Sequence, residues 1–261
     1  METIIICVLA GMGAGLGTGF AGMSAATIIS PMLITFLGVN AFEAIGIALA
    51  SDVLASAVSA FTYGKNKNID LKRGVSLFVS VLIFTGIGAY VSHLFPSTTI
   101  GNLSVFGSLF MGLNFLKKSF SKEKPKKLIE FNDKMKIIMP IFCGALIGLI
   151  CGFIGAGGGM MMLLLLTMVL GYELKTAVGT SVFIMTFTAL FGSYSHFSLD
   201  NIMPDPLICI ICVISTLAFA SIGSRYANKA NPRKLNRATG LVLASLGGFM
   251  IFAQYFPALQ Y

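Results

Sequence analysis

Ten apolar segments, separated by short polar stretches, follow one another along the 261-residue chain. They run roughly over residues 2–20, 24–38, 41–62, 74–94, 99–116, 137–154, 158–170, 174–196, 203–224 and 238–256. Most approach the ~20 residues that a helix needs to cross the hydrocarbon core of a bilayer. Only 11% of the residues are charged, whereas a soluble domain carries about 25%. The pattern predicts an all-α integral membrane protein of ten helical segments.

Two of the segments, 24–38 and 158–170, are shorter than the others, and each follows a glycine-rich break. A helix of this length does not cross the hydrocarbon core. We therefore expect these segments to be half-helices or to lie deep inside the protein. An arrangement in which segments one and two enter and return as a V is also compatible with the pattern.

Basic residues are concentrated in the loops that follow segments three, five and nine. They are Lys65, Lys67, Lys72, Arg73, Lys117, Lys118, Lys122, Lys124, Lys126, Lys127, Lys134, Lys136, Arg225, Lys229, Arg233, Lys234 and Arg237. If every segment crosses, the three loops lie on one side, which the positive-inside rule makes the cytoplasm. Both termini are then outside. The net charge of +8 is thus explained by orientation, and we expect no nucleic-acid partner.

The halves of the chain resemble each other at an offset of 133 residues, without a gap. The matching positions are Gly11, Gly15, Leu16, Gly19, Phe20, Gly22, Leu37, Gly38, Ala44 and Gly46, with Gly144, Gly148, Leu149, Gly152, Phe153, Gly155, Leu170, Gly171, Ala177 and Gly179. The prediction is an N-terminal repeat (1–118), a basic cytoplasmic linker (119–136) and a C-terminal repeat (137–261). Because each repeat has five segments, an odd number, the two are inverted, which is typical of secondary transporters with a site near the membrane midplane.

Two motifs in the second half carry a family resemblance. Residues 152–159 (GFIGAGGG) and 177–181 (AVGTS) flank a short apolar helix, and together they resemble the TauE/SafE family of sulfite-exporter-like membrane proteins. In the first half, residues 22–26 (GMSAA) replace the glycine cluster, and 45–48 (IGIA) replace the Thr-Ser element. The resemblance implies transport of sulfite, sulfonates or related sulfur-containing anions across the cell membrane.

The two glycine-rich breaks are the candidate substrate site. A helix that begins at such a break has unpaired backbone N–H groups and a positive dipole end, which favour an anion. We expect a shared anion site made by Gly22, Met23, Ser24, Ala25, Gly155, Ala156, Gly157, Gly158 and Gly159. Thr180 and Ser181 have hydroxyls that could donate to an oxyanion. The alternatives are close helix packing for the glycines, and a helix cap or a bond to a preceding carbonyl for the hydroxyls.

Asp52 is the one acid well inside an apolar segment. Ionisable residues at membrane depth are costly and face the bundle interior or a wet cavity. The hypothesis is a role in proton coupling or gating, and the alternative is a neutral, hydrogen-bonded aspartic acid that helps packing. Glu43 and Glu173 are expected to cap helices. His93 and His196 are each expected to be a lone histidine at the outer interface.

The favoured function is a secondary transporter of a small sulfur-containing anion. The alternatives are a channel-like pore, a transporter of another small organic anion, or a membrane scaffold without transport. The chain has none of the hydrolase, metalloprotease or nucleotide-binding motifs, so we expect neither an enzyme nor a cofactor. Two separated histidines and cysteines within apolar runs predict no metal site. The expected partners are a small anionic solute, the lipid bilayer and a second copy in a homodimer.

Overall fold

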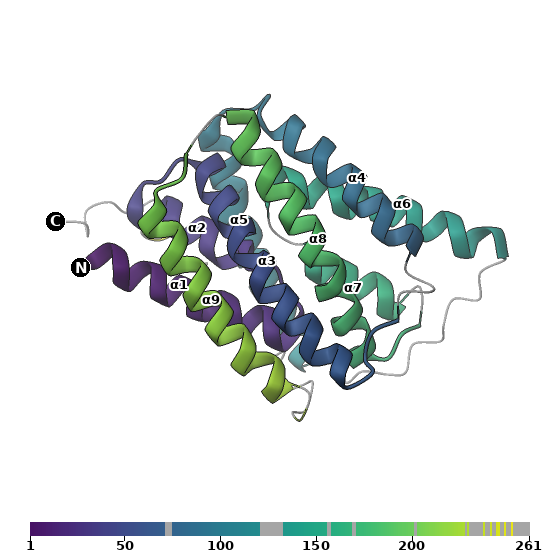
Figure 1. Ribbon diagram of the computed structural model, residues 1–261. Helices are drawn as coiled ribbons and strands as arrows, with labels where there is room; N and C mark the ends of the chain where they lie inside the picture. Colours follow the sequence, from purple (N-terminus) through teal and green to yellow (C-terminus); the bar gives the residue numbers. More distant parts are fainter. Residues whose placement is uncertain are drawn as a thin grey trace.

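A computed structural model describes residues 1–70, 75–120, 133–155, 158–168, 171–200 and 203–227, with a few single positions beyond. Within these ranges the chain forms nine helices and no strand (Figure 1). They are α1 (Glu2–Ala21), α2 (Ala26–Leu37), α3 (Ala41–Lys65), α4 (Val75–Ser92), α5 (Ser97–Phe120), α6 (Asp133–Ile154), α7 (Gly158–Met168), α8 (Leu174–Asp200) and α9 (Pro206–Ala227). The all-α prediction is confirmed. Most of the predicted linker, and the tenth predicted segment apart from single positions, lie outside the described residues.

Five of the helices are long and apolar enough to cross a membrane: α1, α3, α4, α8 and α9. The two short segments are short helices, since α2 has 12 residues and α7 has 11. At 1.5 Å per residue, each is about 17 to 18 Å long, well under the ~30 Å of the hydrocarbon core. The sequence therefore located the two elements that do not span by themselves.

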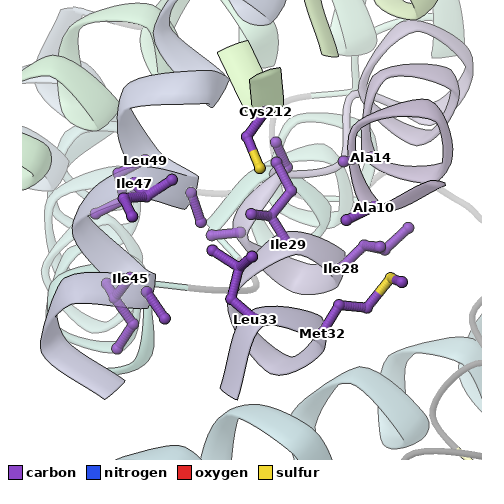
Figure 2. Packing of buried hydrophobic residues seen from close by; sticks show 14 of the residues in the cluster. Ala10, Ala14, Ile28, Ile29, Met32, Leu33, Ile45, Ile47, Leu49 and Cys212 are labelled. Carbon is purple, nitrogen blue, oxygen red and sulfur yellow. The ribbon is translucent and has the colours of Figure 1, made fainter. Parts of the chain in front are cut away.

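Helix α2 is buried in the interior of the protein. Every residue from Ala26 to Leu33 is buried, and α2 packs against α1, α3 and α5. Figure 2 shows Ile29 and Leu33 of α2 between the side chains of α3 and those of α1, with Cys212 of α9 above them. Because protein surrounds the helix, its first two turns need no contact with lipid. Helix α2 also packs on α1, its neighbour in the sequence, and the V arrangement stays a prediction.

Six of the matched glycines lie where two pairs of helices cross. Gly11, Gly15 and Gly19 of α1 lie against α9, and Gly144, Gly148 and Gly152 of α6 lie against α4. At each of these positions an added Cβ atom would overlap an atom of the facing helix, and at Gly15, Gly19, Gly148 and Gly152 it would overlap the backbone of that helix. These six glycines therefore allow the close backbone approach that membrane helices use for packing.

The two crossings are equivalent atom by atom. A Cβ at Gly15 would meet the backbone oxygen of Thr216 and the nitrogen of Ala220, and a Cβ at Gly148 would meet the same atoms of Val81 and Thr85. Among the described residues, the four glycines with positive φ form two further matched pairs, Gly22 with Gly155 and Gly38 with Gly171. The internal repeat and the inverted orientation of its halves both stay predictions.

The glycine crossings give a first prediction. Gly148→Ala should lower the apparent unfolding temperature by several degrees, because overpacking costs about 1–3 kcal/mol. Gly107→Ala is the matched control, since a Cβ there meets no described atom within 4 Å. A thiol-reactive dye can follow unfolding, because the five cysteines are free and three of them are buried. Equal unfolding temperatures for the two variants would contradict the role assigned to Gly148.

Candidate functional site

The two glycine-rich breaks meet in the interior. Gly22 ends α1 and Gly155 ends α6, both in the left-handed region with φ of 61° and 73°. A Cβ at Gly159 would overlap the backbone oxygen of Gly22, and the Ser24 hydroxyl lies 3.4 Å from the backbone oxygen of Gly155. Each helix that stops therefore directs a carbonyl toward the start of the short helix in the other half. Ala156 and Gly157 lie outside the described residues.

Asp52 of α3 is hydrogen-bonded at this meeting point. The Ser24 hydroxyl donates to Asp52 Oδ2 at 2.8 Å, and the Ser56 hydroxyl donates to Oδ1 at 3.0 Å. The backbone N–H of Ala26, the first residue of α2, points to Ser24 Oγ at 3.4 Å. Asp52 is 1% exposed. Its carboxyl group thus lies at the N-terminus of α2, the helix end that favours negative charge.

The second half places a different side chain at the equivalent position. At the offset of 133 residues, Met185 corresponds to Asp52, and the two serines correspond to Gly157 and Ala189. In the structure, Met185 Sδ lies against Gly159 in the first turn of α7. The acid is therefore at the start of α2, while a thioether lies at the start of α7.

The two predicted hydroxyl residues lie in different surroundings. Ser181 is at the meeting point, because a Cβ at Gly22 would come within 2.8 Å of Ser181 Oγ. Its hydroxyl donates to the Val178 backbone oxygen at 2.9 Å. Thr180 instead binds the loop after α3, since Asp70 N donates to its Oγ1 at 3.0 Å. The structure therefore brings Ser181, but not Thr180, to the predicted site.

The described residues at the meeting point are enclosed by protein. Met23, Ala25, Asp52 and Ser181 are buried, as are Gly22, Ser24, Gly155, Gly158 and Gly159. None of the residues that the structure describes at the meeting point has an exposed side chain. Any solute that binds here requires the helices to separate on one side.

The two histidines were expected to lie apart, but the structure brings them together. The rings of His93 and His196 lie 5.5 Å apart, and Phe42 stacks on His93 at 4.5 Å. His196 is 1% exposed, and its Nε2 lies 2.9 Å from the Gly152 backbone oxygen. Because a carbonyl only accepts, Nε2–H is the donor there. The interfacial prediction is therefore wrong for His196. If every segment crosses, segments four and eight end on the same side of the membrane because both are even-numbered. This is the feature of the sequence that could have indicated that the two histidines lie close together.

Glu43 also makes a contact that was not expected. Asn40 caps α3, because its Oδ1 accepts from Phe42 N at 2.9 Å. The Glu43 carboxylate accepts from Asp205 N at 3.0 Å, immediately before α9. Glu43 therefore lies in the first turn of α3, where its negative charge is favourable, and also connects α3 to the start of α9. Because Glu43 and Asp205 are 162 residues apart in the sequence, this contact could not be inferred from the sequence.

Comparison with known proteins adds to this geometry. The family model described as "Sulfite exporter TauE/SafE" matches residues 7–250. The chain belongs to the TauE/SafE family. Among its relatives is the probable membrane transporter protein YunE of Bacillus subtilis, 24% identical over 97% of this chain and 99% of that one. Another is the probable membrane transporter protein MJ0441 of Methanocaldococcus jannaschii, 25% identical over 80% and 78%. No solved structure matches the chain. This TauE/SafE member is a multi-pass membrane transporter.

The Ser24–Asp52 hydrogen bond gives a second prediction for this TauE/SafE protein. Ser24→Ala should lower the free energy of unfolding by about 1–3 kcal/mol, because a buried acceptor loses its donor. Ser221→Ala is the control, since Ser221 Oγ donates to Leu217 O within its own helix. Thermal unfolding in detergent should show a smaller loss for the control. If Ser24→Ala costs as much in an Asp52→Asn background as in the wild type, the two residues are not coupled.

Proposed function

We propose that the protein is a secondary transporter that carries a small sulfur-containing anion, sulfite, a sulfonate or a related organosulfur anion, together with protons. The observation that carries the proposal is the position of Asp52, held by Ser24 at the start of α2 where the two breaks meet. The class of anion comes from the family description as a sulfite exporter. Two broken repeats around one ionisable residue are the layout expected of a site near the membrane midplane.

The proposed coupling follows from electrostatics at the two short helices. When Asp52 is ionised, its charge offsets the positive end of α2 and repels a second anion. When Asp52 takes up a proton, that helix end is no longer compensated. The N–H groups in the first turns of α2 and α7 then favour an anion. Proton and anion therefore bind together, and each increases the affinity for the other.

The enclosed site requires a movement to release its cargo. We propose that the two repeats are inverted and that one moves against the other, opening the meeting point to each side in turn. The small residues of the α1/α9 and α4/α6 crossings would let each pair move as a unit. In this proposal the basic loops face the cytoplasm and both termini lie outside.

Purified protein in liposomes tests the function. We expect saturable uptake of one anion among sulfite, a sulfonate, thiosulfate and sulfate, and accumulation driven by a pH gradient that is acidic on the side of entry. Asp52→Asn fixes a neutral group at the site, so it should keep anion exchange but lose accumulation driven by the gradient. Glu2→Gln, an exposed acid in the first turn of α1, is the control and should accumulate anion normally.

The outcomes separate the alternatives. Gradient-driven accumulation by Asp52→Asn at the wild-type level would refute coupling through this residue. Flux without saturation and without response to the gradient would indicate a pore. No flux of any anion, in protein shown to be folded, would leave a scaffold without transport as the remaining class.

A further inference from the structure

A groove of about 540 Å³ lies between α3 and α8, away from Asp52. It is lined by Ala57, Ala60, Phe61, Gly64, Lys65, Ile69, Phe183, Thr186 and Phe187. All of these residues except Ile69 belong to α3 or α8, which lie side by side at the front of the molecule in Figure 1. We refer to it below as the lateral groove.

The sequence of α3 explains the shape of the lateral groove. Ala57, Ala60 and Gly64 follow one another at intervals of three and four residues, so they lie on one helix face and leave it hollow. Phe183 and Phe187 of α8 form the opposite wall, with their rings 5.2 Å apart. The lining is almost entirely apolar. Its one polar side chain from α8 is that of Thr186, which donates to Val182 O within the same helix.

The face around the lateral groove is apolar and exposed. Phe61 is 63% exposed and Phe187 is 41% exposed. The neighbouring exposed side chains on α3 and α8 are Leu54, Leu190, Phe191 and Tyr194. In a protein that spans a membrane, an apolar face of this kind contacts acyl chains, and a hollow in it is filled by one of them.

Lys65 gives the lateral groove a charged end. It is the last residue of α3, and its Nζ lies 4.6 Å from the centroid of the Phe61 ring. Lys67 is exposed two residues further along. A lysine at the end of a membrane helix extends its ammonium group toward the headgroup region. At that depth the positive charge of Lys65 is complementary to the phosphate of a lipid headgroup that carries no positive group of its own.

We propose that the lateral groove binds one anionic phospholipid, with an acyl chain against Ala57, Ala60 and Gly64 and the headgroup phosphate at Lys65. A second copy of the chain is the other possible occupant of this face. A two-fold dimer would use the same surface patch on both subunits. It would therefore place two Lys65 side chains at the same depth in the membrane. An anionic headgroup instead neutralises that charge. The proposal does not depend on which anion the protein carries.

Lipid retention by the full chain tests the proposal. The protein is equilibrated with equal amounts of phosphatidylglycerol and phosphatidylcholine in detergent, and retained lipid is measured by native mass spectrometry. We expect the wild type to retain one phosphatidylglycerol in preference to phosphatidylcholine. Lys65→Gln should lower that preference about fivefold, the contribution of one basic residue near an anionic lipid surface. Lys229→Gln, which removes an exposed lysine beyond α9, should leave it unchanged.

Two further variants fill the lateral groove rather than change its charge. Ala57→Leu and Gly64→Leu place a side chain in the hollow, and both should reduce retention of phosphatidylglycerol and phosphatidylcholine alike. Thermal unfolding confirms that each variant is folded. An unchanged preference in Lys65→Gln would overturn the proposal, as would unchanged retention in both leucine variants. A dimer that dissociates in Ala57→Leu while lipid retention stays constant would assign the face to a second copy instead.

Discussion

A helix that stops inside a membrane protein leaves backbone groups that lipid cannot satisfy, so other parts of the protein must satisfy them. In this chain the two breaks lie together, and the Ser24 hydroxyl lies 3.4 Å from the Gly155 backbone oxygen. The end of α1 faces the start of α7, and the end of α6 faces the start of α2. The burial of α2 within the bundle, and the glycines that let α1 and α6 pack closely on their partners, accompany this arrangement.

The two halves place different side chains at the junction. The first half uses a serine and an aspartic acid at the start of α2, where the second half has glycine and methionine. The departure of residues 22–26 from the glycine cluster is thus explained, since Ser24 is the residue that donates to Asp52. A protein with two identical halves would have two such acids or none. Asp52 is the one carboxyl group among the described residues of the junction, so one proton changes its charge.

Much of the architecture was predictable because it depends on local sequence. Segment length and hydropathy located the nine described helices to within a few residues, and the register of the glycines identified the paired breaks before any contact was known. The side-chain partners were not predictable in the same way. Ser24 and Asp52 are 28 residues apart, Thr180 and Asp70 are 110 apart, and the histidines meet only because α4 and α8 pack together. Such pairs depend on how the helices are arranged in space, which hydropathy does not specify.

The most direct test of the account is to count the protons taken up when an anion binds. A sulfonate is the appropriate ligand, since its own charge does not change near neutral pH. Added to the purified protein in weak buffer with a pH indicator, it should cause proton uptake by the wild type and none by Asp52→Asn, although both bind it. Equal proton uptake by the two proteins would contradict the claim that Asp52 links the proton to the anion.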